Sequence, residues 1–349
     1  MSSRQATSGQ WPYPRAGVSN VQTPPGTPII QVEGLRVAFF SREGVVKAVN
    51  GITFSLRENS ILAMVGESGS GKTVTALSIL GLVPYPGRIM EGRVLFNGVD
   101  LVTMHPEALR RVRGKEIGMV FQDPMSSLNP SIAIGIQVEE VLLAHTDATR
   151  QEARIWAQEL LTEMGLPDSS RLLKQYPFQL SGGMRQRVML SIAMALRPKV
   201  LIADEPTSNL DTTLQAAILS QLRKLKQEHG TAILLITHDM GVVAQMADQV
   251  AVMYAGSIVE HAATANIFQR PAHPYTWGLL QSIPRLDDAS RKLRPMGGRP
   301  PDLINLPDEC PFLPRCFKAS TLCRASPRPA LRPLQEGHVV ACFNEIKHE

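Results

Sequence analysis

Ile61–Thr73 reads ILAMVGESGSGKT, and this stretch decides how the rest of the chain is interpreted. Its first five residues form an apolar run with the length of a buried strand. The next eight, Gly66–Thr73, match the pattern G-x-x-x-x-G-K-[ST], which requires a strand before it and a helix after it. Val74, Leu77 and Leu80 follow at three-residue steps and predict that helix. The stretch therefore predicts a phosphate-binding loop.

The residue types of this loop suit a nucleotide. Glycines let successive backbone N–H groups turn toward phosphate oxygens, and a helix N-terminus adds a partial positive charge. We expect Lys72 to reach the β- and γ-phosphates and the Thr73 hydroxyl to ligate Mg²⁺. A simple glycine-rich turn is the alternative, and the flanking strand and helix disfavour it. The expected ATP-binding residues of the loop are Gly66, Glu67, Ser68, Gly69, Ser70, Gly71, Lys72 and Thr73.

A second apolar run, Val200–Ala203, ends in two adjacent carboxylates, Asp204 and Glu205. Neighbouring side chains of a strand point to opposite sides, so the two acids need not share one task. After a phosphate-binding loop, Asp204 is expected to hold Mg²⁺ and Glu205 to orient or deprotonate the attacking water. An acidic turn at a strand end, without catalytic role, is the alternative.

The rest of the chain alternates between strand and helix patterns. Residues 29–56 contain short β-rich runs, residues 135–196 are predicted to be mainly helical, and Ala232–Ile236 is another buried-strand run. Ser181 is expected to open a helix. This alternation predicts an α/β fold with a mainly parallel central sheet.

Length and composition narrow the classes of protein. The chain has 349 residues with 44% hydrophobic, 19% charged and 5% aromatic residues, which fits a globular protein of two or three domains. The net charge of +5 permits an anionic ligand but does not require nucleic acid, and few aromatics argue against a stacking surface for single strands. The basic run from Arg110 to Lys115 is interpreted as a solvated helix face.

No apolar stretch is long enough to span a membrane, and the proline-rich residues 1–28 lack the features of a signal peptide. We expect residues 1–28 to be a disordered extension, and the protein to stay in the cytosol and reach a membrane only through partners.

Prolines and glycines from Pro284 onward predict a linker. The four cysteines, Cys310, Cys316, Cys323 and Cys342, all follow it. In a cytosolic chain this clustering favours a metal over disulfides.

A phosphate-binding loop alone also occurs in kinases, GTPases and helicases, and further motifs discriminate among these classes. Leu180–Arg187 reads LSGGMRQR and resembles the signature of ABC ATPases. Gln122 resembles the family's Q-loop glutamine, Ser208–Asp211 its D-loop, and His238 its switch histidine. Asn209 stands where the family usually has alanine, and Thr73 where serine is commoner, but neither change removes a needed group.

The resemblance implies a set of roles. Glu205, His238 and Lys72 are implied as catalytic, and Thr73, Gln122 and Asp204 as magnesium ligands. The signature implies that two cassettes close two ATP sites head to tail. Phe39 and Phe40 are candidates for the aromatic that stacks on adenine, although core packing explains them equally well. The implied ATP-contacting residues beyond the loop are Gln122, Asp204, Ser181, Gly182, Gly183 and Asp211.

Within the ABC ATPases, Gln122–Pro130 (QDPMSSLNP) and His273–Thr276 (HPYT) resemble the D-type ATP-binding subunits of dipeptide and oligopeptide importers. The resemblance implies a RecA-like parallel sheet with an antiparallel β part, a helical subdomain at about 123–198, a nucleotide-binding domain over 29–260 and a Cys-rich extension over 261–349. It implies a 4Fe-4S cluster on the four cysteines. The cysteine spacing alone also leaves zinc or unligated thiols open.

The same resemblance implies the partners: a second homologous ATPase subunit forming a heterodimer, two permease subunits and an extracytoplasmic substrate-binding protein. It places the chain on the cytoplasmic side of the plasma membrane, as a peripheral subunit. Importers of nickel or glutathione are alternatives for the solute. A soluble ABC ATPase acting on DNA or ribosomes is disfavoured, because about 109 residues separate Lys72 from Ser181, too few for a long coiled coil, and the chain holds one cassette. A small-molecule phosphotransferase should lack the LSGG motif.

Overall fold

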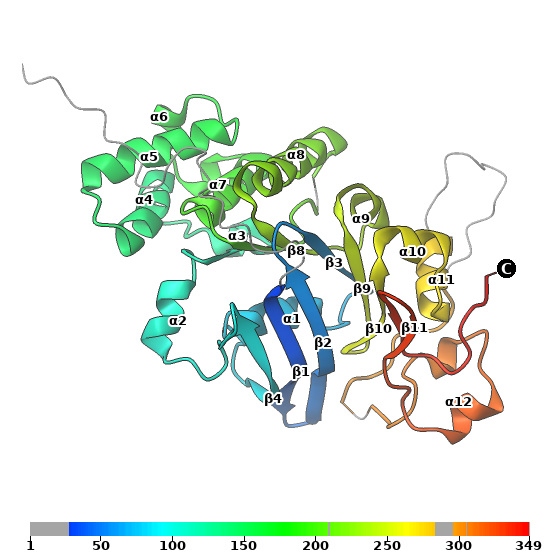
Figure 1. Cartoon of the computed structure of the whole chain (residues 1–349). Coiled ribbons are helices and arrows are strands. Elements are labelled where there is room, and N and C mark those ends of the chain that lie inside the picture. Colours follow the sequence, from blue (N-terminus) through cyan, green and yellow to red (C-terminus); the bar gives the residue numbers. More distant parts are fainter. Residues whose placement is uncertain (1–27, 209, 283–295, 305, 349) are drawn as a thin grey trace, which may run out of the picture. The chain divides into compact units, whose positions relative to one another are not determined.

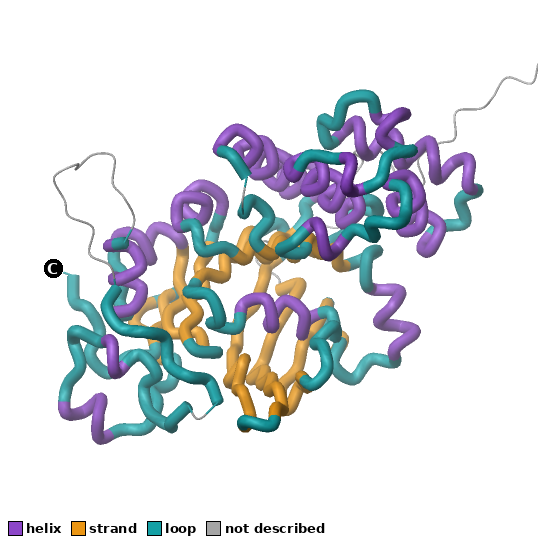
Figure 2. Tube along the Cα trace, turned by 180° about the vertical axis from the view of Figure 1, so that it is seen from behind, coloured by secondary structure: helices purple, strands orange, loops and turns teal. Residues whose placement is uncertain are grey.

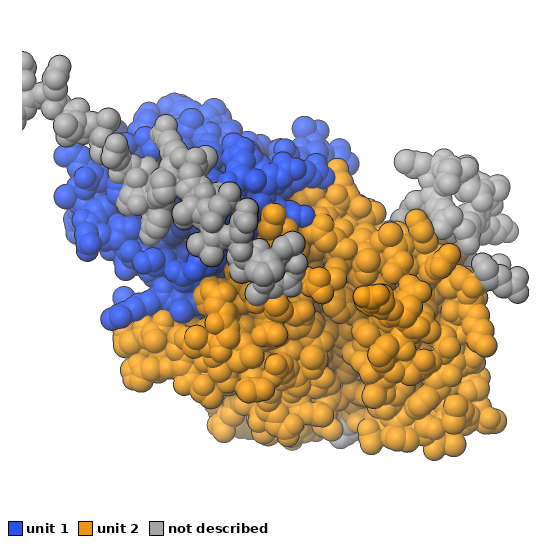
Figure 3. Space-filling model, in the orientation of Figure 1, with its two compact units in different colours: residues 1–25, 110–201, 206–231 blue, residues 26–109, 202–205, 232–349 orange. Residues whose placement is uncertain are grey.

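The computed structural model describes residues 28–208, 210–282, 296–304 and 306–348. The chain divides into two compact units, which Figure 3 colours separately. Most of the predicted extension over residues 1–28, and the prolines at 284 and 295 of the predicted linker, lie outside the described residues. Pro28 is the exception, because it begins the first strand. The first unit contains Arg110–Leu201 and Pro206–Thr231; the second contains Gly26–Leu109, Ile202–Glu205 and Ala232–Glu349.

The second unit contains an antiparallel sheet in the order β2-β1-β4-β5 (Figure 1). Two long strands form its hairpin, where the sequence predicted several short runs. In β2, Ile52, Phe54 and Leu56 are buried and alternate with more exposed residues, which is the period-two pattern of a sheet with one covered face. The strands are β1 Pro28–Ser41, β2 Gly44–Arg57, β4 Gly87–Phe96 and β5 Val99–Asp100.

The second sheet of this unit runs in the order β11-β12-β10-β9-β3-β8-β7. Strand β3 pairs in parallel with β8 and β9, whereas β10 and the two following strands pair antiparallel. Every residue of β3, β7 and β8 is buried, so the predicted parallel centre of an α/β fold is confirmed. The strands are β3 Ile61–Val65, β7 Val200–Asp204, β8 Ala232–Ile236, β9 Gln249–Tyr254, β10 Ser257–Ala263, β11 Arg332–Gln335 and β12 His338–Val340.

Short helices complete this unit. A core cluster beside β9 and β10 contains Tyr254, Tyr275 and Phe312, three fully buried aromatic side chains. They bring the C-terminal segment onto the sheet, since Phe312 belongs to that segment. The helices are α1 Lys72–Ile79, α9 Met240–Met246, α10 Thr264–Gln269, α11 Pro274–Gln281, the 3₁₀ turn η2 Leu313–Arg315 and α12 Thr321–Ala325. Helix α2, Pro106–Val112, leads the chain into the first unit.

The first unit is mostly helical (Figure 2). Helix α5 begins at a capping box, in which Thr149 and Glu152 satisfy each other's backbone N–H groups. Its elements are β6 Ile117–Val120, α3 Pro124–Ser127, α4 Ile134–His145, α5 Arg150–Glu163, α6 Ser169–Leu172, η1 Pro177–Gln179, α7 Gly182–Met194 and α8 Thr212–His229, with β6 beside the start of β7. Among the described residues, no helix combines the length and the apolar character needed to cross a membrane.

Candidate active site

The predicted phosphate-binding loop lies between β3 and α1, and two of its glycines cannot be replaced without a clash. A Cβ on Gly66 would meet the Met253 carbonyl oxygen at 2.2 Å, and one on Gly71 would meet the Ala48 carbonyl oxygen at 2.3 Å. Gly71 also has φ of 101° at the N-cap of α1, a backbone region that favours glycine. The turn and the close backbone approach therefore require these glycines.

Lys72 is buried at the first position of α1 and is held by the loop itself. Its ammonium donates to the carbonyl oxygens of Gly66 and Glu67 at 2.8 and 2.9 Å, and lies 3.3 Å from the Ser70 hydroxyl. Burial lowers the pKa of Lys72, while Glu205, Asp204 and Glu67 oppose this shift. The ammonium is thus positioned in the loop, near three carboxylates that oppose the effect of burial on its pKa.

Asp204, at the end of β7, fits a magnesium ligand. Burial raises the pKa of Asp204, and a hydrogen bond from Thr73 opposes the shift. Its Oδ1 atom is buried, with no hydrogen-bond partner in the part of the chain that the structure describes. An orphaned buried carboxylate oxygen next to a threonine hydroxyl matches the hard oxygen donors that Mg²⁺ prefers, with phosphate and water supplying other ligands.

Glu205 and His238 meet at the carboxyl ends of β7 and β8. The Nδ1 atom of His238 lies 2.8 Å from Oε1 of Glu205. Glu205 is 9% exposed and has φ of 51°, a left-handed conformation that is unusual for glutamate. Strained backbone of this kind concentrates at functional sites and costs on the order of 1–3 kcal/mol. The geometry suits a carboxylate oriented by a histidine toward a reacting water.

The signature and D-loop residues lie in the first unit. Ser181 is the N-cap of α7, and its hydroxyl accepts a hydrogen bond from the Met184 N–H at 3.3 Å. Asp211 is the N-cap of α8 and accepts from the Leu214 N–H at 2.9 Å. A Cβ on Gly183 would meet the Leu214 side chain at 2.6 Å. The close packing of these two helices therefore accounts for glycine at position 183. These contacts show local structural roles and leave the predicted ATP contacts as predictions.

Other predicted residues are placed as follows. Gln122 is exposed just after β6 in the first unit, whereas Thr73 and Asp204 are together in the second.

Phe40 is 41% exposed, and Phe39 is partly buried, with its ring next to Gly87. Of the two adenine-stacking candidates, Phe40 therefore presents the more accessible ring. Asn209 lies outside the described residues.

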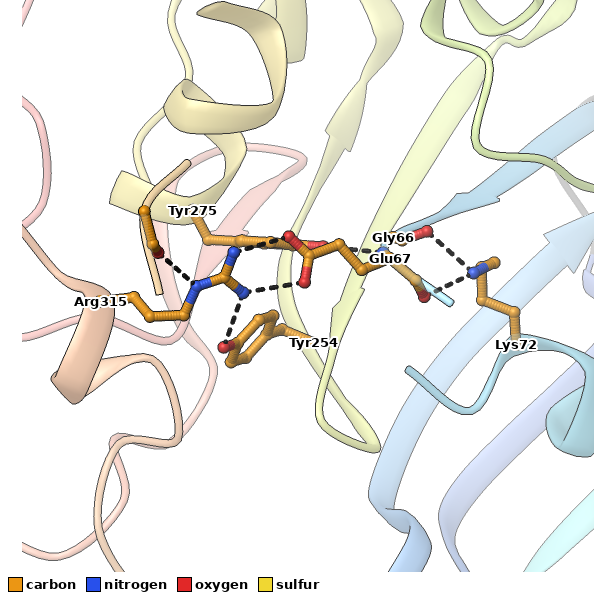
Figure 4. Close-up of polar contacts among 7 residues, drawn as sticks. Gly66, Glu67, Lys72, Tyr254, Tyr275 and Arg315 are labelled. Carbon is orange, nitrogen blue, oxygen red and sulfur yellow. Dashed lines mark hydrogen bonds and ion pairs between the residues drawn. The ribbon is translucent and has the colours of Figure 1, made fainter. Parts of the chain in front are cut away.

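Two partners of the phosphate-binding loop could not be assigned from the sequence. The Glu67 N–H donates to the Tyr275 hydroxyl at 2.9 Å, and the Glu67 carboxylate pairs with Arg315 (Figure 4). Tyr275 belongs to the HPYT motif quoted above, although that motif gave no role for it. Arg315 precedes Cys316 and carries no sequence signal of its own. The loop is therefore supported by the C-terminal segment as well as by the sheet.

The four cysteines line one hollow of the C-terminal segment, beside His273, Phe312 and Lys318. All four are free thiols, and burial raises the pKa of Cys342 to about 12. Within the described residues, no group of three or more His, Cys, Asp or Glu side chains is placed to hold a metal ion. The predicted metal site, whether a 4Fe-4S cluster or zinc, is therefore not supported by the described residues and stays a prediction.

Comparisons with known proteins agree with the motifs. A profile of the family described as ABC transporter matches residues 49–208, and one described as oligopeptide/dipeptide transporter, C-terminal region, matches residues 259–323. The dipeptide transport ATP-binding protein DppD of Bacillus subtilis is 45% identical over 90% of this chain and 94% of its own. The oligopeptide transport ATP-binding protein OppD of Salmonella typhimurium is 44% identical over 93% and 96%.

Solved structures give the same fold. A dimeric structure of the bacterial ABC transporter cassette MJ0796 aligns with a TM-score of 0.61 at 28% identity, covering 67% of this chain and 98% of that one. A dimeric post-hydrolysis state of the same cassette, bound to ADP and Pi, aligns with a TM-score of 0.61 at 27% identity. The predicted cassette fold is confirmed; the predicted domain boundaries stay predictions.

Proposed function

Because the chain belongs to the ABC transporter family, in the branch of dipeptide and oligopeptide transport ATP-binding proteins, we propose that it powers the import of di- or oligopeptides. The observation that carries this proposal is the match of residues 259–323 to the C-terminal region described for such transporters. The family consists of ATPases, so ATP and Mg²⁺ belong to its chemistry. Relatives that are 44–46% identical bear dipeptide or oligopeptide transport names.

Uptake by the assembled transporter tests the solute. The chain is purified with its permease and ATPase partners, reconstituted in liposomes and supplied with the substrate-binding protein. Labelled di- and oligopeptides should enter in an ATP-dependent manner, whereas labelled Ni²⁺ and glutathione should not. If only nickel or glutathione entered in an ATP-dependent manner, the assignment of peptides as the solute would be wrong, and the assignment of the chain as an ATPase would stand.

The geometry at the sheet edge supports the proposed hydrolytic roles. Glu205 orients and deprotonates the attacking water, and His238 holds the Glu205 carboxylate through the 2.8 Å contact at Nδ1. Lys72 leaves the loop carbonyls to bind the terminal phosphates. Thr73 and Asp204 would hold Mg²⁺, and Gln122 stays a predicted ligand. A magnesium ion held there would neutralise charge that develops on the phosphates.

The second half of each ATP site comes from another subunit. Ser181, Gly182 and Gly183 form the N-terminus of the 13-residue helix α7, whose free N–H groups suit a phosphate. Ser181 and Gly182 are exposed, and a Cβ on Gly182 would meet open space. We assign this end to ATP bound by a homologous ATPase subunit, with Asp211 at the same dimer contact. The lone chain should hydrolyse ATP on the order of 10²-fold more slowly than the heterodimeric complex.

The permease contact is assigned to the segment after β6. Gln122–Pro130 is largely exposed, and Met125 within it is 53% exposed. Phe178, which stacks with Tyr176 in the same unit, is 66% exposed. Exposed apolar side chains of this kind mark contact surfaces. This proposed contact would hold the chain peripherally on the cytoplasmic side of the membrane. Gln122→Ala should lower transport per ATP hydrolysed, and an unchanged ratio would refute the assignment.

A 4Fe-4S cluster is assigned to Cys310, Cys316, Cys323 and Cys342. The supporting observation is the donor set, four thiols around one hollow. A zinc ion with Zn–S bonds of about 2.3 Å needs its sulfurs close together, whereas a cluster separates them more widely and takes four cysteines. Protein purified without oxygen should be brown and contain about four irons per chain. A colourless preparation with one zinc per chain would contradict this.

A further inference from the structure

Glu67 is a carboxylate placed inside a loop that binds phosphate, and it is paired with an arginine from the far end of the chain. The two guanidinium nitrogens of Arg315 lie 2.8 and 2.9 Å from the two carboxylate oxygens of Glu67. Figure 4 shows this two-pronged contact, with Lys72 on the other side of the loop. The Arg315 side chain is 5% exposed. Two parallel charge-assisted bonds fix both the position and the charge of Glu67.

Arg315 is held in place before it meets Glu67. It donates to the Tyr254 hydroxyl at 3.1 Å and to the Gly297 carbonyl oxygen at 3.0 Å. Its guanidinium carbon also lies 5.8 Å from the Tyr254 ring centre and 5.9 Å from that of Phe312. The guanidinium of Arg315 carries a permanent positive charge, because arginine is not deprotonated in proteins. A fixed cation with little freedom is a strong partner for a loop carboxylate.

The backbone of Glu67 is held by the same part of the chain. Its N–H donates to the Tyr275 hydroxyl at 2.9 Å, and its carbonyl oxygen accepts from Lys72. Tyr254, Tyr275 and Phe312 pack against one another with ring centres 4.5 to 5.5 Å apart. The loop position between Gly66 and Ser68 is therefore tied to the C-terminal segment at its side chain and at its backbone.

The charge of Glu67 explains why such a partner is needed. ATP brings negative charge to the loop, and an uncompensated carboxylate in that loop would repel it. If one member of a buried ion pair is removed, the other charge is left without a partner to compensate it. Arg315 cancels this repulsion, and it is supplied by a segment 248 positions away.

We propose that Arg315 is a positioning residue for the phosphate-binding loop, through which the C-terminal segment sets the affinity of the site for ATP. Arg315 neutralises Glu67 and holds the loop open for phosphate without touching the nucleotide. Arg315 acts on ATP binding by this chain, whatever the transported solute.

Nucleotide binding to the full chain tests the proposal, with Mg-ATP and Mg-ADP titrated by calorimetry. Arg315→Ala should weaken ATP binding about 10- to 100-fold and ADP binding less, because ADP carries less charge. Glu67→Gln combined with Arg315→Ala should restore ATP binding to within a few-fold of the unmodified chain. Arg315→Lys should fall between the two, since it keeps the charge but loses the fork. Arg93→Ala, which breaks an exposed pair with Glu33, is the control and should change nothing.

Two results would overturn the proposal. One is equal loss of ATP and ADP binding in Arg315→Ala with no recovery in the double variant, which would make Arg315 a structural support alone. The other is unchanged ATP binding in Arg315→Ala. If Arg315→Ala does not fold, Glu67→Gln alone decides the matter. It should bind ATP at least as tightly as the unmodified chain, and a tenfold weakening would contradict the charge argument.

Discussion

The carboxyl edge of the parallel sheet and the cysteine-bearing C-terminal segment hold their functional side chains by different means. Asp204 and Glu205 leave β7, in which every residue is buried, and neighbouring β8 is buried throughout as well. The segment after Met296 has only short elements, such as η2 with three residues and α12 with five. At the sheet edge, strand register fixes the positions of the functional side chains before any ligand binds. In the C-terminal segment, these positions depend on side-chain contacts and, in our proposal, on ligation.

A buried polar anchor links the two regions and clarifies the contrast. The Glu260 carboxylate in β10 is fully buried and accepts from the N–H groups of Ala272 and His273 at 2.7 and 2.8 Å. His338 in β12 lies 2.8 Å from the same carboxylate. These polar contacts help to attach the C-terminal segment to the sheet. Breaking one of them would leave a buried polar group without a partner, which costs free energy of folding. Loss of one of these contacts should therefore loosen the C-terminal segment.

The largest expected effect lies at the sheet edge. Glu205→Gln should lower ATP turnover of the assembled complex on the order of 10²–10³-fold, because the carboxylate that activates water is lost. ATP binding and protease resistance of the C-terminal segment should not change. The measurement is steady-state ATPase beside equilibrium binding. Turnover close to that of the unmodified complex would remove Glu205 from the mechanism.

A change at the cysteines should produce the opposite pattern. Cys316→Ser should expose residues 300–345 to protease, because this part of the chain has too little regular structure to order itself without ligation. ATP binding should weaken as well, because Arg315, which pairs with Glu67 of the phosphate-binding loop, lies in the stretch that is exposed. Limited proteolysis with mass analysis measures the first effect. Equal protease resistance in variant and parent would end the idea that ligation orders this segment.

The smallest effect is a pH dependence in the anchor. Burial lowers the pKa of His273 to about 4, opposed by Glu260, whereas the unfolded chain titrates near 6.5. Between these values only the unfolded chain binds the proton, so stability is complete above pH 6.5 and falls as the pH falls toward 4. From pH 7 to pH 5 this histidine should cost about 2 kcal/mol.

His273→Asn tests the pH effect, because asparagine keeps an acceptor for the Tyr275 N–H, which now donates to His273 Nδ1 at 3.0 Å, but does not titrate. The free energy of unfolding, followed by denaturant titration at both pH values, should drop by about 2 kcal/mol less in the variant. His261, whose pKa is also lowered by burial to about 4, keeps its own share in both proteins. An identical pH dependence in the two would show that His273 is not the group involved.

The sequence predicted those parts of the candidate site whose residues are close together along the chain. Gly66–Thr73 lies within eight consecutive positions, and Asp204 with Glu205 ends a buried strand, so spacing alone located them. The helix after Ser181 and the parallel strands followed from periodicity. The family resemblance and the cassette fold were confirmed by the comparisons.

The remaining features depend on contacts that spacing does not encode. Arg315 and Glu67 are 248 positions apart, and nothing near either residue signals the pair. The positive φ of Glu205 arises from the turn between β7 and the following loop, and no glycine marks it. Asp211 caps α8, a local role that the sequence did not assign to it, and its predicted contact with ATP stays a prediction.

Transport and hydrolysis measured together test the central claim most directly, namely that the ATP site of this chain drives peptide uptake. Liposomes carrying the complete transporter are compared with ones in which only this chain carries Glu205→Gln, and labelled peptide and released phosphate are followed together. We predict that uptake stops together with hydrolysis while the complex still binds ATP. Continued peptide uptake at the rate of the unmodified transporter would contradict the account.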